Sequence, residues 1–353
     1  MRSKLAIGAL VAVMALVWVS PAAATGRSLE LDFRGQAIVP TGTMFEGTTV
    51  GGLSSITYDR RRDAFYVLSD DQSQFQPARF YTVELDVRDG RLTDDDVQFA
   101  QVTTLRAPDG RPYPPMSLDP EGLALTKGRE LILTSEGLPS RLIDPFVCRY
   151  SLHGAFLGSL PVPSAFDVTA DGSSGVRPNL GFESAGVDGR HLFVGAENAL
   201  YQDGPAATTA NGSPARILRY DLRRNRLERQ WIYVTDPVAE PPVPATQFSV
   251  NGVVELLPLN NAFLIAMERS FSVGAPGTGN TIELFRVALP GSGDTAEKTL
   301  LLDLDELGIP LDNVEGMTFG PRLPDGRRSV VMVSDDNFAA TQFTQFLVFA
   351  IDR

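Results

Sequence analysis

Five similar segments with alternating apolar and polar positions recur along the chain. Each contains a small or acidic residue, a glycine, a run of alternating apolar residues, a turn, a short apolar stretch and a closing Asp or Glu. The segments are GGLSSITYDRRRDAFYVLSDD from Gly51, DPEGLALTKGRELILTSEG from Asp119, GFESAGVDGRHLFVGAEN from Gly181, VNGVVELLPLNNAFLIAMER from Val250 and NVEGMTFGPRLPDGRRSVVMVSDDN from Asn313. Their starts lie about 60 to 70 residues apart. Strand-turn-strand units at this spacing are typical of propeller blades with long loops.

Two more strand-like stretches follow each of the first four segments. They show the two-residue alternation of half-buried strands. The stretches are RFYTVELDV from Arg79 and VQFAQVTTL from Val97, FVCRYSL from Phe146 and AFLGSLPV from Ala155, ARILRYDL from Ala215 and RLERQWIYV from Arg226, and TIELFRVAL from Thr281 and KTLLLDL from Lys298. Each unit therefore supplies four strands. Helix signals are weak, and LDLDELG from Leu302 would make at most one turn.

The fifth unit is one strand short, because only TQFLVFAIDR from Thr344 follows its first two strands. A strand-like stretch near the start of the chain, SLELDFRGQAIV from Ser28, has no unit of its own. Pairing these two stretches would close a ring. We therefore predict an all-β propeller of four-stranded blades that forms a single domain over residues 25–353. Five blades is the direct count, and six remains open if the connection from Val162 to Pro178 contains a degenerate blade.

The N-terminus has the features of a secretory signal peptide over residues 1–24. Arg2 and Lys4 precede an apolar run from Leu5 to Val19, and Ala22-Ala23-Ala24 provides a cleavage site. The apolar run is shorter than the roughly 20 residues that span a bilayer. We expect a secreted or periplasmic protein without membrane attachment. Cys148 is the single cysteine, so no intramolecular disulfide can form.

The chain is strongly acidic, with 31 basic and 43 acidic residues and a net charge of −12. Removal of Arg2 and Lys4 with the signal brings the net charge to about −14. Nucleic acid and anionic membranes are therefore excluded as partners, and we expect a monomer that binds a small molecule. An acidic exported protein can simply be well solvated. The positions of the acidic residues must carry any functional argument.

Acidic and amide residues recur at two positions of the repeat. In an antiparallel blade, the start of the first strand and the end of the second lie at the same end of the sheet. Asp119, Glu121, Glu183, Asn251, Asn313 and Glu315 occupy the first position, and Asp70, Asp71, Glu136, Glu197, Glu268, Asp335, Asp336 and Asn337 occupy the second. We therefore expect these side chains to converge at one mouth of the central channel.

Converging carboxylates repel one another unless a cation lies among them. Ca²⁺ takes six to eight oxygen ligands from carboxylates, amides and carbonyls, with flexible geometry. One cysteine and two histidines, His153 and His191, cannot make a typical zinc site. We predict Ca²⁺ or another hard divalent cation, with the ligands drawn from Asp70, Asp71, Glu136, Glu197, Asn251, Asn313, Asp335 and Asp336.

Arginines accompany these acidic positions. A Pro-small-Arg pattern ends at Arg79, Arg141 and Arg216, and Arg269 follows Glu268 directly. The planar guanidinium suits phosphate, although these arginines could equally neutralise acidic neighbours in a structural network. Carboxylates, metal and arginine together are what phosphoester hydrolysis requires. We predict substrate-binding roles for the three Pro-small-Arg arginines, and the predicted catalytic residues are Glu121, Glu183, Glu268, Glu315 and Arg269.

The sequence resembles the phytase-like family, described as the esterase-like domain of phytases. The matching stretches are GGLSSITYD, DPEGLAL, GFESAGVDG, the Glu268-Arg269 pair and, above all, NVEGMTFGPRLPDGRRSVVMVSDDNF with the following TQFLVF. The resemblance implies a phosphoesterase activity outside the cytoplasm. It brings no assigned catalytic residue that could be transferred to this chain.

Three functional hypotheses remain open. The leading one is a metal-assisted hydrolase of phosphate esters such as inositol phosphates. A second keeps an enzyme but changes the bond, because propellers with carboxylate and amide metal sites also open lactones. A third is a non-catalytic propeller that binds a metal or an exported ligand. A serine hydrolase is disfavoured, because the chain has no G-x-S-x-G elbow.

Overall fold

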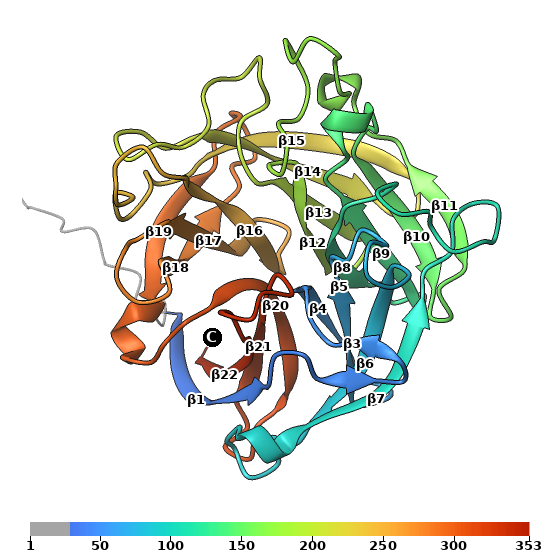
Figure 1. Cartoon of the computed structure of the whole chain (residues 1–353), viewed down its shortest axis with the longest axis vertical. Helices are drawn as coiled ribbons and strands as arrows, with labels where there is room; N and C mark the ends of the chain where they lie inside the picture. The colour runs from blue at the N-terminus through green and yellow to red at the C-terminus, as the bar shows by residue number, and fades with distance from the viewer. Residues whose placement is uncertain (1–28, 353) are drawn as a thin grey trace, which may run out of the picture.

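The computed structural model describes residues 29–352 and consists of five four-stranded antiparallel sheets arranged around a central axis (Figure 1). The predicted all-β propeller is confirmed, with five blades in this part of the chain. The signal peptide predicted over residues 1–24 lies outside the described residues.

The first four blades follow one another along the chain, and in each the first strand lies innermost. Blade 1 contains β4 (Leu53–Asp59), β5 (Ala64–Ser69), β6 (Arg79–Leu85) and β7 (Val97–Thr104), and blade 2 contains β8 (Pro120–Leu125), β9 (Glu130–Ser135), β10 (Phe146–Ser151) and β11 (Phe156–Leu160). Blade 3 contains β12 (Phe182–Asp188), β13 (His191–Ala196), β14 (Pro214–Asp221) and β15 (Arg226–Val234), and blade 4 contains β16 (Ser249–Asn260), β17 (Phe263–Ser272), β18 (Asn280–Ala288) and β19 (Glu297–Asp303).

Blade 5 combines strands from both ends of the chain. It contains β20 (Asn313–Arg322), β21 (Arg328–Asp335) and β22 (Thr344–Asp352), with β1 (Glu30–Val39) as its outermost strand. β1 pairs antiparallel with β22, so that Glu30 lies opposite Asp352 and Val39 opposite Thr344. In Figure 1 the blue β1 lies beside the red β22.

Few other elements interrupt the sheets. The described chain adds a short hairpin, β2 (Met44–Phe45) with β3 (Thr48–Thr49), and four 3₁₀ turns, η1 (Asp94–Asp96), η2 (Pro139–Arg141), η3 (Ser164–Phe166) and η4 (Leu304–Leu307). The connection from Val162 to Pro178 holds η3 and no strand, so the alternative of six blades is wrong. Within residues 29–352, no helix is long and apolar enough to span a bilayer.

The hydrophobic core lies between neighbouring blades. Strand β21 contributes side chains to the core on both faces of its sheet. Val331 and Val333 pack against blade 1, whereas Val330 and Met332 pack against blade 4. Because both faces of the sheet are covered, the strand is a continuous apolar run and not an alternating one.

Every innermost strand contains a β-bulge near its start. The ladder registers shift between Leu53 and Ser55, Pro120 and Leu123, Phe182 and Ser184, Val253 and Glu255, and Val314 and Gly316. A bulge places an additional residue opposite one partner and re-aims its side chain. The same local irregularity therefore recurs at the same end of all five blades.

Candidate functional site

The bulges deliver three carboxylates toward the axis of the ring. The residues inside the register shifts of blades 2, 3 and 5 include Glu121, Glu183 and Glu315. Blade 1 has Ser54 at this position and blade 4 has Val254. The three glutamates are all less than 10 % exposed.

A second ring of charged residues lies at or near the end of the second strand of each blade. In blades 1, 2, 3 and 5 these residues are Asp70, Glu136, Glu197 and Asp335. In blade 4 the equivalent residue is Arg269, which lies opposite Gly252, two residues before the bulged Val254. Asp335 has the same relation to Asn313 and the bulged Glu315.

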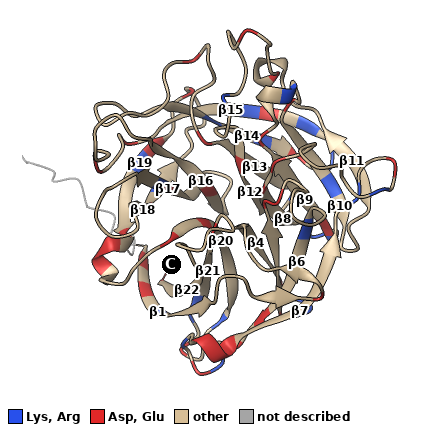
Figure 2. Cartoon of the chain, in the orientation of Figure 1, with Lys and Arg blue, Asp and Glu red and all other residues tan. Residues whose placement is uncertain are grey.

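These two rings line a cavity of about 1110 Å³. Its acidic lining residues are Asp70, Glu121, Glu136, Glu183, Glu197, Asp312, Glu315 and Asp335. Arg269 is the one basic residue that lines it in the described part of the chain. Figure 2 shows acidic segments at the ends of strands that surround the centre of the ring. We call this space the acid cavity.

Two groups of three carboxylates, all of which line the acid cavity except Asp119, have the spacing of a metal site. Oxygens of Asp119, Glu121 and Glu136 lie within 4.8 Å of one another, and so do oxygens of Glu136, Glu183 and Glu197. Glu136 belongs to both groups and also accepts a 2.7 Å hydrogen bond from the backbone N–H of Gly181. All five residues are buried, so water provides little compensation for their charges.

Burial and mutual repulsion raise the pKa values of these carboxyls. Burial raises the pKa of Asp119 to about 6. Burial, only partly opposed by the nearby Arg269 charge, raises the pKa of Glu197 to about 7. Burial together with neighbouring carboxylates raises the pKa well above the ordinary range for Asp70, Glu121, Glu136, Glu183 and Asp335. Without a cation, these carboxyls therefore retain their protons to a higher pH than carboxyls in water.

Arg269 and Asn313 organise one side of the acid cavity. The Arg269 guanidinium donates a 3.0 Å hydrogen bond to Glu315 and lies 3.5 Å from the Glu197 carboxylate. The Asn313 amide donates to Glu315 at 2.9 Å and to Asp335 at 3.3 Å. Glu315 thus has both a guanidinium and an amide partner in the protein.

Two carboxylate oxygens in the acid cavity are buried without a hydrogen-bond partner among residues 29–352: Glu197 Oε1 and Asp70 Oδ1. Gly52 leaves room for Asp70, because an added Cβ would lie 2.0 Å from the Asp70 oxygen. The φ of Gly52, +62°, also favours glycine at this position. Buried acceptors normally find a donor or a cation. Glu197 is 1 % exposed, and its Oε1 lies 3.5 Å from the Arg269 guanidinium without a hydrogen bond, so this oxygen could still accept a bond from a ligand or a cation.

Glu268 and Asn251, predicted as site residues, do not line the acid cavity. Tyr233 donates a 2.7 Å hydrogen bond to Glu268, whose carboxylate also lies 2.5 Å from the Lys298 ammonium. Asn251 donates to the other Glu268 oxygen at 2.9 Å. The expected convergence fails here because Glu268 and Arg269 are consecutive in a strand, and consecutive side chains point to opposite faces.

Asp71 and Asp336 also lie away from the cavity lining, in the loops after the second strands. Asp71 accepts hydrogen bonds from the backbone N–H groups of residues 74–76 and a 2.7 Å hydrogen bond from Arg79. Asp336 accepts from the backbone N–H groups of Gly52 and Phe338 at 2.9 and 3.0 Å. Both carboxylates hold loop backbone in place.

None of the three Pro-small-Arg arginines lines the acid cavity. Arg79 is buried, and its partner Asp71 neutralises it. Arg216 makes two hydrogen bonds to Asp203, at 2.5 and 2.7 Å. Arg141 is exposed in η2. The structure therefore does not bring them together with the carboxylates, and their substrate-binding role stays a prediction.

The repeat pattern did not predict several other residues that line the acid cavity. Phe248 and Phe271 provide apolar wall, and Asn179, Asn280 and Gln342 provide amides. They come from loops and strand ends of different blades, so only the folded ring places them together.

Buried carboxylates from four blades and one arginine from the remaining blade define this molecule as a five-bladed propeller with a polyanionic axial cavity. The chain belongs to the phytase-like family, described as esterase-like activity of phytase, whose family model matches residues 48–338. No curated protein matches the sequence.

Solved structures with a similar shape include several glycoside hydrolases. An endo-arabinase from Bacteroides thetaiotaomicron is 14 % identical, with 90 % of this chain and 97 % of that chain covered and a TM-score of 0.46. A thermostable family-43 glycoside hydrolase is 10 % identical, with 90 % and 92 % covered and a TM-score of 0.47. A glycosyl hydrolase from Bacteroides ovatus is 12 % identical, with 90 % and 94 % covered and a TM-score of 0.45.

Proposed function

We propose that the protein is a metal-assisted hydrolase of phosphoric esters whose reaction takes place in the acid cavity. The observation that carries the proposal is the grouping of Glu136 with two sets of buried carboxylates beside a single arginine. The family, described by an esterase-like activity, agrees with this chemistry.

The residues present fit a hard divalent cation. The donors are carboxylate oxygens, which Ca²⁺ prefers, and Glu197 Oε1 is buried with no hydrogen bond of its own. Asp119, Glu121, Glu136, Glu183 and Glu197 would hold the cation. When bound, it would polarise a phosphoryl oxygen and lower the pKa of a coordinated water.

Arg269 provides the positive charge that a phosphate ester needs in an otherwise acidic cavity. Its Nε makes no hydrogen bond among residues 29–352, so a donor remains for a phosphate oxygen. Glu315 accepts a hydrogen bond from the neighbouring Nη2 and so helps to orient the guanidinium.

The proposal includes a monomeric protein, with a small phosphate ester as ligand, that is exported after removal of residues 1–24. N-terminal sequencing of the protein recovered outside the cytoplasm tests the export. A mature N-terminus near residue 25 is expected, and retention of Met1 on exported protein contradicts signal cleavage.

The activity is tested with inositol hexakisphosphate, p-nitrophenyl phosphate and bis(p-nitrophenyl) phosphate, each in Ca²⁺ and in EDTA. We expect Ca²⁺-dependent phosphate or nitrophenol release that falls at least about tenfold in Glu183→Gln, because the cation loses a carboxylate ligand. Glu84→Gln is the matched control, because Glu84 is exposed on β6. Absence of turnover on all three esters overturns the proposal. Lactone opening without phosphate release would select the lactonase, and Ca²⁺ binding without any turnover would select the non-catalytic propeller.

A further inference from the structure

Two buried serines at the start of β4 join blade 1 to blade 2. Ser54 and Ser55 are 4 % and 1 % exposed. The Ser54 hydroxyl donates a 3.1 Å hydrogen bond to the backbone C=O of Glu121, and the backbone N–H of Leu123 donates a 3.0 Å hydrogen bond to Ser55 Oγ. The two serines therefore hold the backbone on both sides of the Glu121 side chain, which the proposed function assigns to the cation.

The Ser55 hydroxyl also contacts a buried glutamate of blade 4. It donates a 3.2 Å hydrogen bond to Glu255, which directly follows the bulged Val254 and is 2 % exposed. The Glu255 carboxyl group accepts a further hydrogen bond, of 2.9 Å, from the backbone N–H of Leu256. Among residues 29–352 it makes no ion pair, so hydrogen-bond donors must compensate for its burial.

The innermost strands of blades 3 and 5 contribute to the same carboxyl group. Burial raises the pKa of Glu255, and hydrogen bonding to the backbone N–H groups of Met317 and Ala185 opposes this rise. Ala185 lies two residues after Glu183, and Met317 lies two residues after Glu315. All five blades therefore meet in one set of hydrogen bonds. In blades 2, 3 and 5 the contributing N–H group lies two residues after a glutamate that lines the acid cavity.

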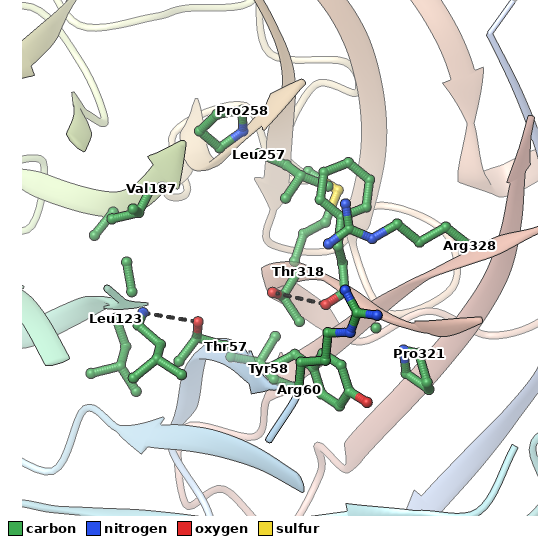
Figure 3. A pocket seen from close by; sticks show the side chains of 18 of the residues that line it. Thr57, Tyr58, Arg60, Leu123, Val187, Leu257, Pro258, Thr318, Pro321 and Arg328 are labelled. Atoms are coloured by element: carbon green, nitrogen blue, oxygen red, sulfur yellow. Dashed lines mark hydrogen bonds between the residues drawn. The ribbon is translucent and has the colours of Figure 1, made fainter. Parts of the chain in front are cut away.

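The hydrogen bonds centred on Ser55 and Glu255, which we call the axial network, lie between the acid cavity and a second cavity of about 700 Å³. The two cavities share no lining residue, and neither Ser55 nor Glu255 lines either of them. Figure 3 shows the second cavity with one labelled residue from each innermost strand: Thr57, Leu123, Val187, Leu257 and Thr318. Because the axial network is almost inaccessible to solvent, its hydrogen bonds are stronger than they would be in water.

We propose that Ser55 and Glu255 are positioning residues of the acid cavity. They hold the innermost strands at a fixed spacing next to the bulges, and so set the distances among the side chains of Glu121, Glu183 and Glu315. Groups that orient metal ligands from behind typically change metal affinity by about 10- to 100-fold when they are replaced. This inference rests on the function proposed for the acid cavity only where the cation is concerned.

Thr57 provides a matched control in the same strand. Its hydroxyl accepts a 3.0 Å hydrogen bond from the backbone N–H of Leu125, so it joins blade 1 to blade 2 as Ser55 does. Thr57 lines the second cavity, where Figure 3 shows its side chain, and it does not contact Glu255. Thr57→Val therefore removes the same type of bond between the same two blades, but outside the axial network.

Calcium affinity separates positioning from general stabilisation. Isothermal titration calorimetry on metal-free protein is expected to show Ca²⁺ binding at least about tenfold weaker in Ser55→Ala and in Glu255→Gln. Thr57→Val should remain within about twofold of the wild type, although it loses an equivalent hydrogen bond. Wild-type affinity in both axial variants, or an equal loss in Thr57→Val, overturns the positioning role.

Amide hydrogen exchange in EDTA tests the same role without a metal. Exchange is expected to be at least about tenfold faster in residues 119–125 of Ser55→Ala and in residues 182–188 and 313–319 of Glu255→Gln, the ratio expected for one lost charge-assisted hydrogen bond. Unchanged exchange, or exchange that is faster to the same extent in all five blades, overturns the proposal. If Glu255→Gln does not fold, Ser55→Ala decides by both measurements. Local changes in a protein whose wild type binds no Ca²⁺ would support the positioning role and refute only the function proposed for the acid cavity.

Discussion

Arg269 donates a 3.0 Å hydrogen bond to Glu315, and this contact joins blade 4 to blade 5 across the acid cavity. The same guanidinium lies 3.5 Å from Glu197 of blade 3. One cation therefore partly neutralises carboxylates from both neighbouring blades. Within residues 29–352, the other carboxylates that line the cavity make no ion pair, which is why a divalent ion is the natural complement of this site.

Replacement of Arg269 by Met is expected to destabilise the calcium-free protein by about 3 kcal/mol, because it leaves buried carboxylates without their cation. Urea unfolding in EDTA measures the effect. Arg88→Met, on an exposed loop, serves as the control. An unchanged unfolding midpoint for the Arg269 variant would show that the cavity is neutralised by other means.

Calcium stabilisation is expected to increase from pH 5 to pH 8. Burial raises the pKa of Asp119 to about 6 and that of Glu197 to about 7, so the folded calcium-free protein binds protons more tightly than the unfolded chain. Its stability is highest below pH 4 for these groups and falls as the pH rises through 6 and 7. Ca²⁺ replaces those protons. Melting temperatures in Ca²⁺ and in EDTA should therefore diverge with pH, and a constant difference would contradict this coupling.

Glu136→Gln is expected to weaken Ca²⁺ binding at least about tenfold, because Glu136 belongs to both three-carboxylate groups. Isothermal titration calorimetry on protein freed of metal measures the affinity. Glu84→Gln is the matched exposed control. Equal affinity in the wild type and in Glu136→Gln would place the cation elsewhere.

Glu268→Gln separates a structural role from a catalytic one. It removes the buried partner of Lys298 and Tyr233, so we expect a loss of about 3 kcal/mol in the free energy of unfolding. Because Glu268 does not line the acid cavity, Ca²⁺ affinity should remain within about twofold of the wild type. A stable variant with lost Ca²⁺ binding would restore Glu268 to the site.

The strands were predictable because their alternation follows from local chemistry. RLERQWIYV, predicted from Arg226, coincides with β15. The count of five units follows from the same pattern. The convergence of Glu121, Glu183 and Glu315 was also predictable, since each occupies the same position at the start of an innermost strand.

The orientation of Glu268 was not predicted, because the blade 4 segment was aligned with the other segments one residue out of register. By residue type, Glu268 corresponds to Glu136 and Glu197 of the other blades. By strand pairing, Arg269 occupies the corresponding position. A shift of one residue turns every side chain to the other face of a strand. The burial of Arg79 was equally hidden, because its partner Asp71 lies on a loop whose path the alternation does not determine.

The pairing of β1 with β22 has a consequence for the order of folding. A strand from the start of the chain has no partner until the last residues have been synthesised, and such distant contacts form slowly. Blades 1 and 5, which carry Asp70 and Asp335, become neighbours only at that stage. The carboxylates proposed to hold the cation lie in blades 2 and 3, which do not depend on this closure. Ring closure would therefore add the charges of Asp70 and Asp335 to a cation site whose ligands are already together.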